Sequence, residues 1–166
     1  MTVLNSTKRG QTPLDGLFII VMLFVFGILI IWGYSFISDF NDDWQSDTAV
    51  SQVSKDVLNT YNDKWSPVWD QAFAWLVGLL WVALILTSFL IDTHPAFFVV
   101  TLVVLLIVFA LIMELSNQYE DFTSQDEMAD FSQDFPMTLW IMDHVLVLSI
   151  VMFLSAGIAL YAKERL

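Results

Sequence analysis

Residues 96–113 read AFFVVTLVVLLIVFALIM, a run in which Thr101 is the only polar side chain. About 20 such residues in a helix cross the roughly 30 Å hydrocarbon core of a bilayer. A helix is favoured over a strand because lipid offers no partner to an exposed backbone N–H or C=O group. Three more stretches approach or exceed this length. The sequence therefore predicts spans at about residues 14–37, 72–91, 96–115 and 138–162.

The composition agrees with a membrane location. Of the 166 residues, 57% are hydrophobic and only 14% are charged, whereas a typical soluble domain has about 25% charged residues. A water-soluble protein of this size could not hide so much apolar surface. We therefore predict an all-α, four-transmembrane-helix protein that forms a single membrane domain over residues 1–166.

Several classes of chemistry are excluded or disfavoured by the residues present. The chain has no cysteine, which excludes disulfides, thiolate catalysis and cysteine-bound metals. It also has no phosphate-binding G-x-x-x-x-G-K-[ST] loop, no G-x-S-x-G nucleophile elbow and no H-E-x-x-H zinc helix. Six basic residues cannot form a nucleic-acid-binding face. We expect no enzyme activity, no cofactor, no metal site and no specific nucleic-acid binding.

Ahead of the 96–113 run, FLIDTHPAFF at residues 89–98 interrupts two long apolar stretches. Asp92, Thr93, His94 and Pro95 are predicted to form a tight inner turn between antiparallel helices, with Pro95 in the first turn of the second helix. The only other histidine, His144, is expected near the opposite membrane face. Haem ligation by the two histidines is therefore not expected.

The basic residues near the chain ends predict the orientation in the membrane. Lys8 and Arg9 precede the first span, and Lys163 and Arg165 follow the last. By the positive-inside rule, both termini face the cytoplasm or a virion interior. The first apolar run has no clear cleavage site after it, so we expect a retained anchor and not a signal peptide. The two larger loops, at about residues 38–71 and 116–137, then lie outside.

These outer regions are strongly acidic. Together with Glu114, at the end of the third span, they carry 14 acids and two lysines. Such a surface suits a basic partner or concentrates cations, but it also suits a solvated face that simply stays soluble. The acids lack the glycine turn and terminal glutamate of an EF-hand calcium loop.

The first outer region contains an amphipathic pattern. Val50, Val53, Val57, Tyr61 and Trp65 recur at helical spacing and line one face. We predict a separate helix from about residue 47 to residue 64, ended by Ser66 and Pro67. It is expected to lie flat on the outer membrane surface, with docking onto a protein partner as the alternative.

Tryptophans gather near the predicted outer boundary. Amphipathic rings prefer this depth because their faces are apolar while their N–H groups stay hydrated. The predicted interfacial belt consists of Trp32, Trp65, Trp69, Trp75 and Trp140.

Ionisable residues inside a span are costly and therefore raise a functional hypothesis. Asp143 and His144 lie near the start of the fourth predicted span, and Glu114 could face them at similar depth. The functional interpretation of this cluster is proton or ion transfer. We favour a structural hydrogen-bond cluster, because the residues lie close to the outer interface.

The four-span layout, the short basic termini and stretches such as IDTHPAFF and LSNQYEDF loosely resemble small membrane proteins of tailless icosahedral phages with an internal lipid layer. The resemblance implies that the outer loops meet capsid proteins, and it assigns no site residue. The function expected first is a structural or scaffold membrane protein whose acidic loops contact other proteins. The alternatives are an ion- or proton-conducting subunit and a non-catalytic subunit of a cellular membrane complex. The lipid-facing sides also leave room for further copies of the chain.

The predicted orientation has a direct test. Accessibility labelling in the intact membrane should find both chain ends on one side and both larger loops on the other, since four spans return the chain to its starting side. An end and a large loop exposed on the same side would contradict the prediction.

Overall fold

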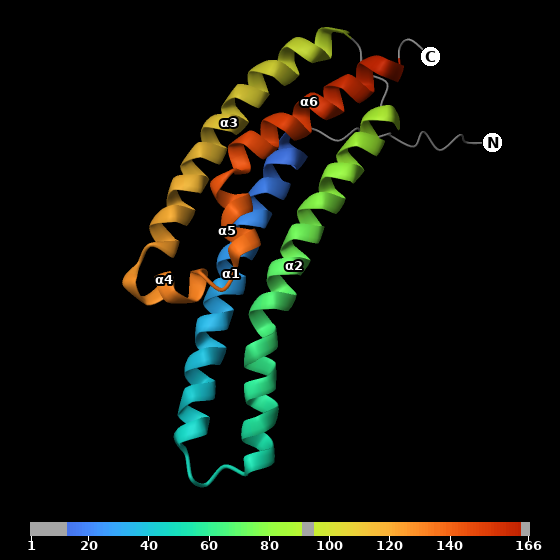
Figure 1. Cartoon of the computed structure of the whole chain (residues 1–166). Coiled ribbons are helices and arrows are strands. Elements are labelled where there is room, and N and C mark those ends of the chain that lie inside the picture. The colour runs from blue at the N-terminus through green and yellow to red at the C-terminus, as the bar shows by residue number, and fades with distance from the viewer. Residues whose placement is uncertain (1–12, 91–94, 164–166) are drawn as a thin grey trace, which may run out of the picture.

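The computed structural model describes residues 13–90 and 95–163, and within them the side chains of 18–88, 103, 105–159 and 162. Every element in these ranges is an α-helix, as the sequence predicts (Figure 1). The helices are α1 (Pro13–Ser46), α2 (Gln52–Leu90), α3 (Pro95–Thr123), α4 (Asp126–Ser132), α5 (Pro136–Asp143) and α6 (Val145–Lys163).

Two helical segments of the described chain, Phe18–Ser46 and Gln52–Ser88, are long and apolar enough to cross a membrane. A third candidate is the pair α5 and α6, which meet at an angle of 70°. The two or three candidates support a membrane protein. The predicted third span begins in residues 95–102, whose side chains lie outside those described, so the count of four stays a prediction.

The helices α1 and α2 are much longer than a bilayer requires. They have 34 and 39 residues, which corresponds to about 51 Å and about 58 Å at a rise of 1.5 Å per residue. They run antiparallel and close to each other, and their connecting turn forms the far end of the molecule (Figure 1). Both helices therefore extend well beyond a 30 Å hydrocarbon layer.

The structure corrects the prediction of a separate amphipathic helix at residues 47–64. Helix α2 starts at Gln52 and continues through Pro67 without a break. A proline inside a helix costs about 3 kcal/mol. Packing of the neighbouring turns on α1 offsets this cost: Trp65 Nε1 donates to the Ile30 carbonyl at 3.3 Å, and the Trp69 ring meets Phe26 edge-on at 6.1 Å.

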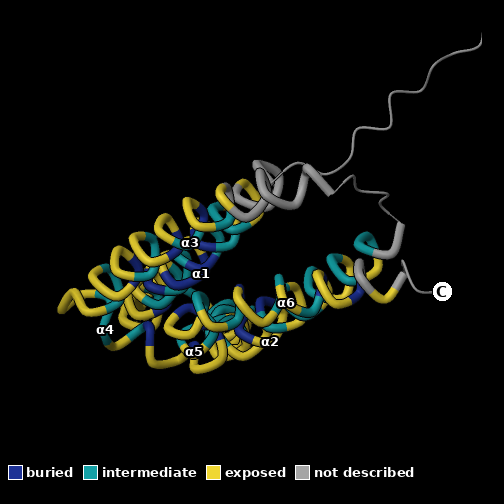
Figure 2. Tube along the Cα trace, turned by 90° about the horizontal axis from the view of Figure 1, so that it is seen from above, coloured by how far each residue is buried: buried dark blue, intermediate teal, exposed yellow. Residues whose placement is uncertain are grey.

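The core lies where α1, α2, α3 and α5 meet. It is built from large side chains with at most 2% of their surface exposed: Phe24, Ile31, Phe73, Tyr119, Phe135 and Met142. Figure 2 shows buried residues on the inner sides of these helices and exposed ones outside. Helix α6 packs on both α2 and α3, and Trp81 Nε1 donates to Ser155 Oγ at 2.8 Å. The predicted inner turn of Asp92, Thr93 and His94 lies outside the described residues, and α3 begins at Pro95.

One glycine permits the closest approach in this core. A Cβ on Gly27 would lie 2.7 Å from Met142 Cε and 3.6 Å from the Tyr119 ring. Gly78 and Gly157, in contrast, have no neighbouring atom within 4 Å of a Cβ. Gly27 therefore leaves room on α1 for the end of the Met142 side chain from α5, beside the Tyr119 ring of α3.

We predict that Gly27→Leu lowers the free energy of unfolding by about 1–3 kcal/mol, because the added carbons overpack a filled core. Gly78→Leu is the matched control and should not lower stability, because it meets no neighbour and leucine favours the helix more than glycine does. Both can be measured by loss of helical circular dichroism as SDS replaces a mild detergent. Equal midpoints for the two variants would contradict the packing described here.

Candidate functional site

A buried carboxylate joins α2 to the start of α5. Asp70, only 4% exposed, accepts the backbone N–H of Met137 at 3.0 Å. Its other oxygen accepts the backbone N–H of Thr138 at 2.7 Å and the Thr138 hydroxyl at 2.8 Å. The first N–H groups of a helix have no partner within the helix, and a carboxylate is favoured at that positive end. Asp70 therefore caps α5 from a different helix.

The local sequence explains why the cap comes from a distance. Pro136 occupies the first turn of α5, and the preceding residue, Phe135, has no side chain that can accept a hydrogen bond. The sequence interpretation counted Asp70 among the solvated outer acids and missed this role. A signal was present, because a helix that begins at Pro136 after Phe135 has no capping side chain at its start, so its first N–H groups need an acceptor from another segment or from water.

A second buried polar group lies in the same core. Tyr119, beyond the end of the predicted third span, is 1% exposed, and its hydroxyl has no hydrogen-bond partner among the described residues. Burial raises the pKa of Tyr119, and the carboxylates of Asp143 and Asp70 raise it further. The hydroxyl therefore stays protonated, since its anion would be both desolvated and repelled.

The predicted cluster of Glu114, Asp143 and His144 does not form a bonded group. All three side chains are exposed, and within the described parts of the chain no hydrogen bond joins any two of them. Glu114 instead accepts from the Gln118 side chain at 3.2 Å. The described residues also include no set of three histidine or acidic side chains placed to hold a metal ion.

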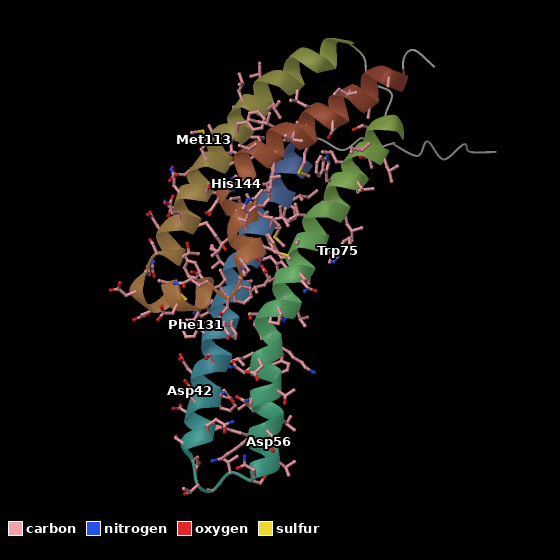
Figure 3. All side chains as sticks on the ribbon, viewed as in Figure 1. Asp42, Asp56, Trp75, Met113, Phe131 and His144 are labelled. Atoms are coloured by element: carbon pink, nitrogen blue, oxygen red, sulfur yellow. The ribbon has the colours of Figure 1, made fainter. Side chains whose placement is uncertain are left out.

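His144 marks the break between α5 and α6, which divides the predicted 138–162 span into two helices. Its ring stacks on Trp140 with centroids 4.8 Å apart, and Nδ1 lies 2.8 Å from the Trp140 carbonyl oxygen (Figure 3 labels His144). From α3, Ser116 Oγ donates to the Met142 carbonyl near the end of α5 at 3.3 Å. Asp143 and His144, two residues of the predicted cluster, thus lie at a bend, whereas Glu114 lies on α3.

The tryptophans predicted to form a belt differ in their surroundings. Trp65 and Trp69 are half-buried against α1, whereas Trp32, Trp75 and Trp140 are exposed. Between Trp65 and Trp75 the helix rises by about 15 Å, so the tryptophans of α2 do not share one level along its axis.

Beyond this core, α1 and α2 continue as a two-helix arm, defined as residues 38–64. The seam between its helices is polar. Asn41 donates to Asn59 at 3.5 Å, Gln45 Nε2 donates to the Lys55 carbonyl at 3.0 Å, and Lys55 Nζ donates to the Gln45 carbonyl at 2.8 Å. These bonds between residues distant in sequence fix the register of the arm.

The acids of the arm point away from this seam. Asp42 on α1 and Asp56 on α2 carry exposed side chains (Figure 3). The complete set of exposed acids on the arm is Asp39, Asp42, Asp43, Asp47, Asp56 and Asp63. More exposed acids surround α4, and this acidic end lies opposite the first residues of α1 and the last of α6 (Figure 1). The negative potential is therefore concentrated at one end of the molecule.

Comparison of the chain with protein-family models, with curated proteins and with solved structures gives no match.

We predict a graded loss of stability at the junction of α2 and α5. Asp70→Ala leaves two backbone N–H groups and a hydroxyl without an acceptor and should cost about 2–4 kcal/mol, while Thr138→Val removes one bond and should cost about 1 kcal/mol. Asp42→Ala, on the exposed surface, is the control. Unfolding in SDS measures the order of stability of the three variants. Hydrogen exchange at the amides of residues 137 and 138 should accelerate in Asp70→Ala alone. A junction that tolerates Asp70→Ala as well as Asp42→Ala contradicts the capping role.

Proposed function

We propose that this chain is a structural scaffold of a membrane-containing assembly, with the acidic arm and the α4 region as its contacts to other proteins. The observation that carries the proposal is the arm itself. Through the arm, α1 continues to Ser46, about 20 Å past the level at which Trp65 meets Gly33. A protein that only had to cross the bilayer would not need this length.

The arm is suited to hold a partner at a defined distance. Its seam bonds fix α1 against α2, and the bonds of Asp70 fix α2 against the start of α5. The Tyr34 ring adds edge-on contacts with Phe131 and Phe135, at 5.9 Å and 5.5 Å, which attach the α4 region to the base of the arm. A rigid support positions a bound protein better than a flexible loop does.

Charge favours basic partners for this surface. Complementary potentials steer association and exclude like-charged surfaces. The resemblance to phage membrane proteins makes a virion membrane the first assembly to examine, with capsid proteins as the partners. A cellular membrane complex, with this chain as a non-catalytic subunit, is the alternative setting.

Ion or proton conduction through Glu114, Asp143 and His144 is the competing function from the sequence. Proton transfer between these groups needs hydrogen bonds that join them directly or through water, and in the described structure no direct bond joins any two of them. The stacking of His144 on Trp140 and its contact with the Trp140 carbonyl favour a structural role for His144 at the bend.

We predict that a photo-crosslinking amino acid at position 42 or 130 forms protein adducts in the native membrane. Position 158, whose side chain is 70% exposed near the opposite end, is the control and should give lipid adducts. Salt at about 1 M before irradiation should remove the protein adducts, since it shortens the screening length to about 3 Å. Recovery of the adducts from purified virions or from host membrane distinguishes the two settings.

Two results would contradict the scaffold proposal. One is the absence of protein adducts from both outer positions. The other is a proton flux in liposomes that Asp143→Asn abolishes, because that would assign conduction to the polar residues at the bend.

A further inference from the structure

We propose that an exposed apolar stripe on the arm, formed by Val53, Val57 and Tyr61, docks a helix of a partner membrane protein whose apolar face is flanked by lysine or arginine. The inference rests on the proposed scaffold function and names the surface and the chemistry of the partner. In the arm, apolar side chains are exposed on the outside while polar bonds join the two helices.

The stripe is open to its surroundings. Val53 is 74% exposed, Val57 66% and Tyr61 52%. Their spacing of four residues places them on one face of α2. Val53 and Val57 also line a shallow hollow of ≈ 320 Å³, together with Asp56 and Thr60. The surface therefore offers apolar contact with an acid at its edge.

Helices that pair in water normally bury apolar side chains between them and expose polar ones. On this face of the arm the valines and the tyrosine point outward, while hydrogen bonds of amides and a lysine join its two helices. Water-exposed apolar stripes of this kind mark surfaces that another molecule covers.

The same face continues along α2 into its apolar half. From Tyr61, residues at intervals of seven are Val68, Trp75 and Val82, which are 57%, 72% and 53% exposed. Residues seven apart lie near one line along a helix, which is half of the apolar pattern of a coiled-coil seam. A helix lying on this seam would stay in contact with α2 both within the lipid and beyond it. This continuity points to a partner that is itself anchored in the membrane.

Charge selects the occupant of the stripe. Lipid is disfavoured because immersion of the arm would carry its aspartates into the bilayer, where each charge is costly. A second copy is disfavoured because it would bring the exposed Asp56 and Asp63 close to their own counterparts. The Lys55 ammonium already bonds to the Gln45 carbonyl of the same arm, and only Lys64 adds another positive charge beside the stripe. A partner helix with flanking basic residues satisfies both the acids and the stripe.

The test uses the full chain in nanodiscs of zwitterionic lipid and a fluorescein-labelled helical peptide of leucine and lysine, with leucine at alternating intervals of three and four. A leucine and glutamate peptide of the same pattern is its matched control, and empty nanodiscs correct for lipid binding. Fluorescence anisotropy gives the affinity. The stripe variant is Val53→Ser, Val57→Ser and Tyr61→Ser together, the acid variant is Asp56→Asn with Asp63→Asn, and Thr48→Ser with Ala49→Ser is the control in the turn.

The basic peptide should bind, and the stripe variant should weaken it at least tenfold with unchanged circular dichroism, because the altered side chains lie outside the seam. The acid variant should weaken binding and reduce its dependence on salt, while the turn control should bind as the parent does. Unchanged affinity in the stripe variant would overturn the inference, and so would equal binding of the acidic peptide. Self-association of the parent that the stripe variant loses would assign the stripe to a second copy.

A crosslinker at position 57 separates this inference from the scaffold proposal. We expect adducts with a membrane-anchored protein, and the crosslinked peptide should contain more lysine and arginine than acidic residues. Protein adducts from positions 42 and 130 without any from 57 would be compatible with the scaffold proposal but would overturn the proposed role of the stripe. No adducts from any of the three positions would overturn both.

Discussion

The capping of α5 by Asp70 is the interaction on which the arrangement of helices depends. The first N–H groups of a helix that begins inside a protein need an acceptor. Phe135, which precedes Pro136 at the start of α5, supplies none. By accepting two of these N–H groups and the Thr138 hydroxyl, one carboxylate of α2 fixes where α5 begins. The same bonds hold the end of the acidic segment around α4, which leads into α5. Asp70 thereby connects the apolar helices to the acidic part of the molecule.

From this junction, the same two helices serve two surroundings. One half of α1 and of α2 is apolar enough for lipid, and the other half forms the acidic arm with its polar seam. The two halves share an uninterrupted helical backbone. Pro67, which would interrupt an isolated helix, is tolerated because the turns on both sides are held by tryptophans against α1.

Much of this organisation could be predicted from the sequence, because membrane spans depend on length and composition alone. The apolar runs, the helical class and the position of the acids follow from residues counted along the chain. The continuity of α2 could not be predicted, because the local preference of Ser66 and Pro67 for a break is outweighed by packing that exists only in the folded protein. The bend at Asp143 and His144 has no proline or glycine to announce it, and its stabilising contact comes from Ser116, on another helix. Asp70 was misread for a similar reason, since its burial depends on a partner about 70 residues away.

The central claim is that α2 is one upright helix that passes from water into lipid, and spin-label depth along it is the most direct test. The chain has no native cysteine, so single labelled cysteines can be placed at positions 53, 57, 61, 68, 75 and 82 in liposomes. Positions 53, 57 and 61 should be as accessible to a water-soluble nickel complex as a label in water. Depth, read from the ratio of collisions with oxygen and with the nickel complex, should then increase steadily from position 68 to 82 by about 1.5 Å per residue. One shallow depth inside the membrane surface shared by positions 53, 57 and 61 would contradict the account and restore a separate helix lying on the membrane surface.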